Sequence, residues 1–152
     1  PPATAAAEGV YALRRADSAG KPYHGTVVLQ ESGVAYEFVQ RVLPEIDRRG
    51  LRLNVFYLSS VELFDLLPES RRAEIFPPEL AQHAMGITGF TLPTLYRWVR
   101  SEAGIGHSLH PFRGGRYPGS GQAEKVLEEA GLDGESQLRA VLDYAASMEG
   151  KR

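Results

Sequence analysis

The chain has 152 residues, 43% of them hydrophobic and 24% charged, with a formal net charge of −2 and no cysteine. This length suits one domain with a single core, the lack of cysteine excludes disulfides and thiolate metal sites, and the slightly negative charge argues against a nucleic-acid-binding surface, which normally carries a basic excess. No apolar run approaches the roughly 20 residues that span a bilayer, so we expect a cytoplasmic protein with no membrane partner and no signal peptide.

The start of the chain differs in composition from the rest. Residues 1–8 are rich in proline and alanine and show no apolar periodicity, so they are predicted to form a linker. The first residue is Pro1 instead of methionine, which indicates a piece of a longer protein. Residues 9–150 are predicted to form the single domain, and one of its faces is expected to pack against protein outside the chain.

The domain opens with two predicted strands and a helix. Val10–Arg14 is a short candidate strand, and Thr26–Gln30 is a continuous apolar run that suits a strand buried on both faces. Residues 32–50 then place apolar side chains at helical spacing and end in a glycine, as helices commonly do. Pro44 is expected to kink this helix near its last turns.

The strongest predicted strand lies in the middle of the chain, at residues 51–58. The four residues that follow match a capping box in which Ser59 pairs with Glu62, so a helix is expected to start as soon as the strand ends. That helix must stop before Pro77, because the residue preceding a proline is disfavoured in the α region.

In the second half of the domain, strands and helices are predicted in alternation, from weaker sequence patterns. Residues 80–88 are a candidate strand, and Thr91 is predicted to cap a helix that continues to Gly104. Residues 105–109 are predicted to form a short strand, followed by an irregular loop at 110–119.

Two further helices, capped by Ser120 and Asp133, are predicted to close the chain. The order of elements predicts an α/β protein: a three-layer α/β/α sandwich around a five-stranded sheet, in which the strands joined by helices are parallel. The first strand has no helical crossover to the second.

Candidate binding residues gather where the parallel strands end. Ligands of open parallel sheets sit beyond the carboxyl ends of the strands, which places the following residues along one edge: Ser32, Gly33, His110 and Arg113. Main-chain N–H groups at the start of a helix hold anions, and a guanidinium pairs with phosphate or carboxylate. These four residues form a candidate anion-binding set. The alternatives are a tight strand-to-helix turn at Ser32 and Gly33, and contact of Arg113 with a neighbouring domain or solvent.

No catalytic constellation is visible. His107 and His110 have no neighbouring carboxylate to complete a metal site, and the chain contains no nucleophile elbow. The aromatic residues Phe90, Tyr96 and Trp98 are predicted to belong to a core or an interface. We therefore expect no catalytic, cofactor-binding or metal-binding residue in this chain.

Several segments resemble the C-terminal domains of transketolases. The most specific is residues 60–71 followed by 75–78, which resembles the stretch after the third strand of that domain. Residues 9–15, 27–35, 111–114 and 123–132 are similar to further segments of it. Together these segments cover nearly the whole chain from Gly9.

The resemblance implies a five-stranded sheet with its first strand antiparallel, and a role. In this family two other domains hold thiamine diphosphate and magnesium, whereas the third packs against them and helps to form the dimer. The expected partners are therefore other domains or subunits of a parent enzyme, with a homodimer as a further arrangement. The parent would be a ketol transferase or the first component of a 2-oxoacid dehydrogenase. The cofactor signature of the family, a GDG followed by paired asparagines, is absent here.

One hypothesis of another class stays open. The chain would then be a free-standing regulatory module that binds a small anionic metabolite at the carboxyl edge of the sheet, through Ser32, Gly33 and Arg113. A complete gene that encodes upstream cofactor domains would favour the transketolase hypothesis, and a short independent gene would favour the module.

Overall fold

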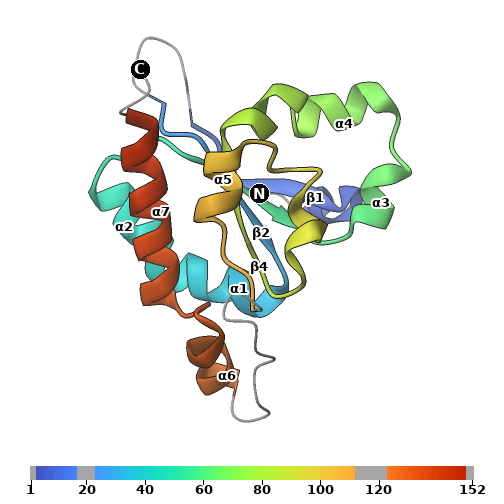
Figure 1. Ribbon diagram of the computed structural model, residues 1–152. Helices are drawn as coiled ribbons and strands as arrows, with labels where there is room; N and C mark the ends of the chain where they lie inside the picture. Colours follow the sequence, from blue (N-terminus) through green and yellow to red (C-terminus); the bar gives the residue numbers. More distant parts are fainter. Residues whose placement is uncertain (1–2, 17–22, 112–122, 150–152) are drawn as a thin grey trace.

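A four-stranded mixed sheet forms the centre of the computed structural model, which describes residues 3–16, 23–111 and 123–149 (Figure 1). The strands are β1 (Val10–Arg14), β2 (Thr26–Gln30), β3 (Asn54–Leu58) and β4 (Ala84–Thr88), in the spatial order β1-β3-β2-β4. The first strand pairs antiparallel with β3, and β2 runs parallel to β3 and β4. The predicted α/β class and the antiparallel first strand are confirmed.

The predicted fifth strand is wrong. Most of residues 105–109 belong to the helix α5 (Glu102–His107), which Ser101 caps by accepting a hydrogen bond from the Gly104 N–H at 2.9 Å. Within the described residues only an isolated parallel bridge between Leu109 and Ile87 extends the sheet beyond β4. The segment is a short apolar stretch beside glycines, which does not distinguish a strand from a helix, and the serine cap and close packing on β4 select a helix.

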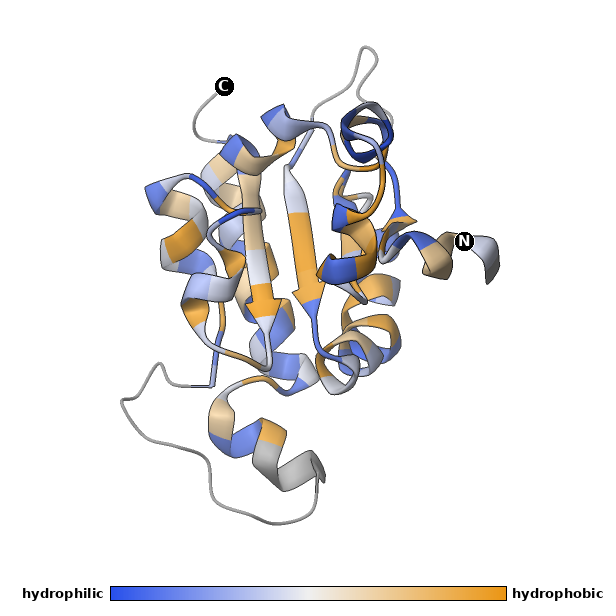
Figure 2. Ribbon diagram, turned by 90° about the vertical axis from the view of Figure 1, so that its right-hand side faces the viewer, coloured by the Kyte–Doolittle hydropathy of each residue, from blue (hydrophilic) through white to orange (hydrophobic). Residues whose placement is uncertain are grey.

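Two apolar cores cover the two faces of the sheet. Because side chains alternate along a strand, Val27 and Leu29 enter one core and Val28 enters the other. Figure 1 shows α2 and α7 on one side of the sheet and α3 and α4 on the other, and Figure 2 shows hydrophobic residues along the strands between these helical layers. The predicted sandwich of helices around a sheet is therefore present.

The helix after β2 is interrupted before its proline, as predicted. It consists of α1 (Ser32–Glu37), a π-helical turn η2 (Phe38–Val42) and α2 (Leu43–Arg48). Pro44 lacks the N–H that an α-helix would use and its ring collides with the preceding turn. The wider π turn, in which the Leu43 N–H reaches the Phe38 carbonyl, accommodates it.

The helix after β3 is capped one residue later than predicted. Ser60, not Ser59, accepts the hydrogen bond from the Leu63 N–H, at 3.2 Å. The N–H groups of Ser59 and Ser60 both donate to the carbonyl oxygen of Gly9, at 2.8 Å each, so Ser59 still belongs to the end of the sheet. The helix divides into α3 (Val61–Asp65) and α4 (Glu69–Ile75), and it ends before Pro77 as expected.

The remaining elements differ more from expectation. The helix predicted from Thr91 to Gly104 is only the four-residue 3-10 turn η4 (Leu92–Leu95), and the part of residues 80–88 before β4 lies in the 3-10 turn η3 (Pro78–His83). The chain closes with α6 (Ala123–Ala130) and α7 (Gly134–Glu149). None of the helices in the described parts of the chain is long and apolar enough to cross a membrane.

The first described residues form a 3-10 helix, η1 (Ala3–Glu8), within the segment expected to be a linker. Its last residue, Glu8, accepts two hydrogen bonds from the Arg71 guanidinium, at 2.6 and 2.8 Å. This hydrogen bonding lowers the pKa of Glu8. The contact links η1 to α4, which belongs to the second layer of helices.

Replacing Tyr144 by phenylalanine is expected to leave the protein as stable as before, or slightly more stable, at neutral pH. The side chain is fully buried, and its hydroxyl has no hydrogen-bond partner among the described residues. Burying this hydroxyl without a partner costs free energy, and phenylalanine removes that cost. Burial, and secondarily the neighbouring Tyr23, raise the pKa of Tyr144 above its usual value of 10.0. The unfolded chain therefore loses this proton first, and stability falls as pH rises beyond about 10. Urea titrations at pH 7 and 10.5 should show that the free energy of unfolding falls less between these pH values in Tyr144→Phe than in the unchanged protein. An equal fall in both would contradict the raised pKa of Tyr144.

Candidate functional site

A network of hydroxyl and amide groups fixes the carboxyl edge of the sheet. The amide oxygen of Gln30, the last residue of β2, accepts hydrogen bonds from the hydroxyls of Thr88 and Thr94, each at 2.7 Å. The Thr88 hydroxyl in turn accepts the Phe90 N–H at 2.9 Å. These bonds hold the segment after β4 across the end of β2.

Glu31 occupies the centre of this edge in an unusual conformation. It follows β2 directly and has φ 89°, the only positive φ of a non-glycine residue in the described ranges. Its carboxylate accepts the N–H of Gly33, at 2.7 and 3.0 Å from the two oxygens, and the N–H of Val34 at 3.2 Å. A side chain at Gly89 would place its Cβ 2.8 Å from Glu31 Cγ, so the segment after β4 closes tightly over Glu31.

Among the described members of the candidate anion-binding set, Ser32 and Gly33 are neighbours, and His110 lies apart from them. Ser32 is exposed and Gly33 follows it in the first turn of α1, where the Gly33 N–H already binds Glu31. His110 comes after Leu109, which pairs with the outer side of β4. The strand β4 therefore lies between His110 and the end of β2. Arg113 lies outside the described residues. An external anion at Gly33 would have to displace the Glu31 carboxylate.

Tyr57 faces the same edge from β3. Its ring contacts that of Tyr11 edge-on, with centroids 5.8 Å apart. Burial raises the pKa of Tyr57, and the charges of Tyr11 and Glu31 add to this shift. The phenol therefore stays protonated and neutral at physiological pH. No group of three histidine or acidic residues within the described parts of the chain could hold a metal ion.

Large exposed apolar side chains also follow the ends of the parallel strands. Six such residues are found in the described ranges: Tyr36, Val39, Leu63, Leu66, Phe90 and Tyr96. The first two lie on the helix after β2, the next two on and beside α3 after β3, and the last two on the segment after β4. Leu66 is the most exposed, at 82%. Phe90, two residues after β4, lies at the carboxyl edge itself, and the others lie on the connecting segments in the two helical layers.

The aromatic residues divide between core and surface. Trp98 is buried at 3% exposure, against Phe64 and Phe76, with ring centroids 5.5 and 5.2 Å away. Phe90 and Tyr96 are half exposed, at 51% and 50%. These three aromatic residues were expected in a core or an interface. Trp98 belongs to the core, and Phe90 and Tyr96 lie on the surface.

Replacing Glu31 by alanine is expected to lower the free energy of unfolding by about 1–2 kcal/mol, because two main-chain N–H groups at the start of α1 lose their acceptor. Alanine also has no side chain that compensates for the positive φ. The matched control is Glu62→Ala: Glu62 is an exposed residue in the first turn of α3 that accepts no main-chain N–H there. Chemical denaturation measures both. Equal effects for the two variants would show that Glu31 is not a structural cap.

Comparison with known proteins gives matches at the level of structure. Neither protein-family models nor curated protein sequences match this chain. A transketolase from Leishmania mexicana superposes with a TM-score of 0.65 and 16% sequence identity, over 95% of this chain and 19% of that chain. A transketolase from Campylobacter jejuni gives a TM-score of 0.62 with 18% identity, over 91% and 19% of the two chains. A transketolase from Pichia stipitis, in complex with sedoheptulose 7-phosphate, gives 0.69 with 16% identity, over 95% and 19%.

These matches establish the fold. The chain spans about a fifth of the length of the transketolases it resembles, 19% in each of these cases. Nearly all of this chain takes part in the match, so its fold corresponds to one compact part of a much longer protein. The chain is therefore a transketolase-like α/β domain in its architecture.

Proposed function

We propose that this chain is the non-catalytic C-terminal domain of a transketolase-type thiamine-diphosphate enzyme, either a ketol transferase or the first component of a 2-oxoacid dehydrogenase. Its function is to pack against the other domains or subunits of that enzyme through the carboxyl edge of the sheet. Thiamine diphosphate and magnesium are held by those other domains. A homodimer is the expected assembly.

The placement of the exposed apolar side chains carries this proposal. Single exposed apolar residues are common on any protein surface, whereas a concentration in one region marks an interaction site. Here Phe90 lies at the carboxyl edge itself, and the other large ones in the described ranges lie on the connecting segments that follow β2, β3 and β4. The likeness to about a fifth of each transketolase supports the rest of such an enzyme as the partner.

The rigidity of the edge supports an interface. The Gln30 amide binds Thr88 and Thr94, and the Glu31 carboxylate binds Gly33. Both sets of bonds fix the backbone that presents the exposed side chains. A surface that is ordered before association loses little conformational entropy on binding, which favours a stable domain contact.

Charged substitutions at the edge test this function. In the isolated chain, Leu66→Asp and Phe90→Asp should change the free energy of unfolding by less than about 0.5 kcal/mol, because both side chains are exposed. In the complete gene product that contains this chain, each should weaken domain or subunit packing by about 2 kcal/mol or more, because a desolvated aspartate has no partner there. Sedimentation velocity and thiamine-diphosphate-dependent turnover measure the effect.

Ala146→Asp is the matched control, since Ala146 is exposed on α7, three residues before Glu149, which binds His24 at the opposite edge of the sheet. This variant should leave assembly and turnover unchanged. Assembly that tolerates aspartate at both Leu66 and Phe90 would contradict an interface at the carboxyl edge.

A further inference from the structure

We propose that a groove between α4, η3 and residues 97–100 is a binding site for small phosphorylated molecules, with Arg72 and Arg100 as the anion-binding groups. The groove has a volume of about 470 Å³, within the range of roughly 300–1,000 Å³ that small-molecule sites occupy. It lies near the start of β4, which follows η3 directly, and thus away from the carboxyl edge. The proposal does not rest on the function proposed above.

The groove has a rigid aromatic floor. Phe64, Phe76 and Trp98 belong to its lining and are all buried, at 3, 7 and 3% exposure. The Phe76 and Trp98 rings meet edge to face at 89° with centroids 5.2 Å apart. Such packing fixes the walls before any ligand arrives, so binding does not require the groove to be ordered first.

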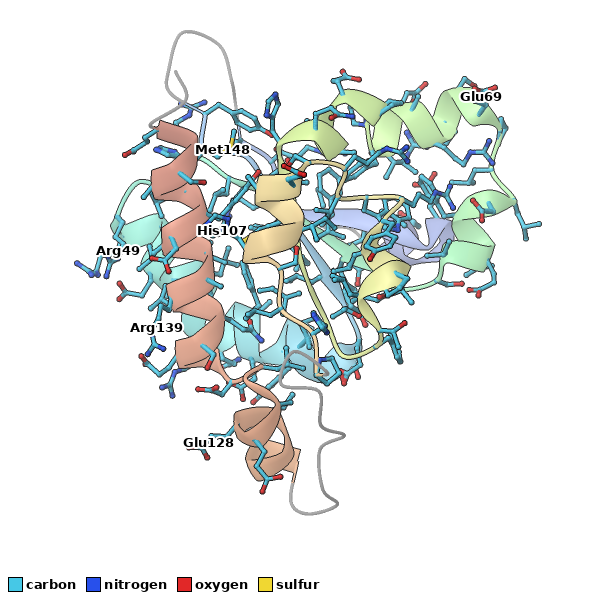
Figure 3. The ribbon with its side chains drawn as sticks, in the orientation of Figure 1. Arg49, Glu69, His107, Glu128, Arg139 and Met148 are labelled. Atoms are coloured by element: carbon cyan, nitrogen blue, oxygen red, sulfur yellow. The ribbon has the colours of Figure 1, made fainter. Side chains whose placement is uncertain are left out.

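The charge of the groove is positive. Three arginines, Arg72, Arg97 and Arg100, line it with a single acidic residue, Glu69. Figure 3 shows Glu69 at the outer end of α4. The whole chain carries a net charge of −2, so this groove is a local reversal of the overall sign. Concave sites lined with one sign of charge concentrate ions of the opposite sign.

The three arginines are not equivalent. Arg97 binds the Asp65 carboxylate, at 2.7 and 3.2 Å, and its guanidinium lies 4.8 Å from the Trp98 ring centroid. This hydrogen bonding lowers the pKa of Asp65, so the pair is fully ionised at neutral pH. Arg97 is thus a structural residue whose charge is compensated.

Neither of the other two arginines is hydrogen-bonded to a carboxylate among the described residues, although the charge of Arg72 contributes, after Arg97, to the lowered pKa of Asp65. Arg72 donates to the main-chain oxygen of Asp65 at 3.2 Å, and among the described residues neither it nor Arg100 has a carboxylate within ion-pair distance. The Arg100 N–H binds the carbonyl oxygen of Ala81, at 2.9 Å, which fixes the backbone that carries this side chain. Two guanidinium groups on separate elements, neither of them in an ion pair, suit a phosphate, because each can bind it through two N–H donors.

The apolar part of the lining determines the rest of the ligand. Ala73, Phe76 and Pro78 lie in the same groove as the arginines. Nonpolar contacts of this kind suit the carbon skeleton of a small metabolite, with its phosphate directed to the guanidinium groups. The inferred ligand class is therefore a phosphorylated small metabolite rather than a bare anion.

The test is calorimetric titration of the chain with four probes at low salt: inorganic phosphate, glucose 6-phosphate, adenosine diphosphate and unphosphorylated glucose. We expect saturable binding of at least one phosphorylated organic probe with a dissociation constant below about 1 mM, weaker binding of inorganic phosphate, and none of glucose. A difference between the sugar phosphate and the nucleotide identifies the carbon skeleton. No saturable binding of either organic probe up to 10 mM would overturn the proposal, and so would equal affinity for inorganic phosphate.

Arg100→Gln is the decisive variant because Arg100 is exposed and has no ion pair in the described structure, so the fold should survive its loss. We expect about a tenfold weakening for it and a complete loss of heat for the double variant with Arg72→Gln. Arg49→Gln is the matched control, as Arg49 is an exposed arginine on the other helical layer, bound to Glu45. Equal weakening by Arg49→Gln would mean non-specific attraction and overturn the site. Because Leu66 and Phe90 do not line the groove, either outcome leaves the interface test unaffected.

Discussion

Replacing Gly104 by alanine is expected to lower the free energy of unfolding by about 3 kcal/mol or more. A Cβ at this position of α5 would overlap the carbonyl oxygen of Ala84 in β4 and lie 2.9 Å from Val99 Cγ1. The overlapping atom belongs to the backbone of a buried strand and cannot move aside. The helix would have to shift away from the sheet and break the contacts that fix its position.

Gly106 provides a matched control in the same helix. No atom lies within 4 Å of a Cβ at Gly106, and alanine is the better helix former by up to about 1 kcal/mol. Gly106→Ala should therefore leave stability unchanged or raise it slightly. Urea denaturation of both variants compares the same substitution at sites two residues apart. Similar effects at the two positions would contradict the close packing of α5 on β4.

The second large effect is expected for Trp98→Ala, with a loss of about 3–5 kcal/mol. This residue is buried between Phe64 and Phe76 and lies under the Arg97 guanidinium. Its truncation leaves a cavity that two fixed aromatic rings cannot fill. The calorimetric unfolding temperature of the isolated chain should fall accordingly.

Tyr96→Ala is the comparison for this prediction, since Tyr96 is an aromatic residue two positions away with 50% of its surface exposed. It should change stability by about 0.5 kcal/mol or less, while affecting assembly of the complete gene product. A large loss of stability in Tyr96→Ala would place this residue in the core and remove it from the proposed interface.

The sequence predicts the first half of the sheet well because the signals there are local. Val10–Arg14 and Thr26–Gln30 have the bounds expected from their apolar runs, and the interruption before Pro44 follows from the chemistry of proline. The third strand is shorter than the predicted one. Residues 51–53, the first three of the apolar stretch, precede the residues of β3 that pair with β2. The side chain of Leu53 still enters the core, and that of Leu51 packs against it.

The errors occur where long-range contacts decide the local structure. Residues 105–109 begin and end with an apolar residue and are short enough to suit a strand, and only the approach of Gly104 to Ala84 shows why a helix forms there. The helix expected to continue to Gly104 is short, because the backbone N–H of Arg100 binds the carbonyl of Ala81 in η3. Neither contact leaves a periodic signal in the sequence.

The candidate edge was predicted in position but not in its chemistry. The order of parallel strands places Glu31, Ser32 and Gly33 at the carboxyl edge, where the structure has them. Sequence reasoning left two interpretations of Ser32 and Gly33 open, an external anion or a tight strand-to-helix turn, and in the structure the Gly33 N–H binds Glu31, which has a positive φ. A glutamate directly before a helix start is a weak signal of such self-capping. The basic groove had no signal, since Arg72 and Arg100 are distant in sequence.

The central claim is that this chain serves as an interface domain of a thiamine-diphosphate enzyme. The most direct test is a calorimetric titration with thiamine diphosphate and magnesium, made on the complete gene product and on this chain alone. The account predicts saturable binding that depends on magnesium in the complete product, and no magnesium-dependent binding in the chain alone. Magnesium-dependent binding to the chain alone, or none to the complete product, would contradict it.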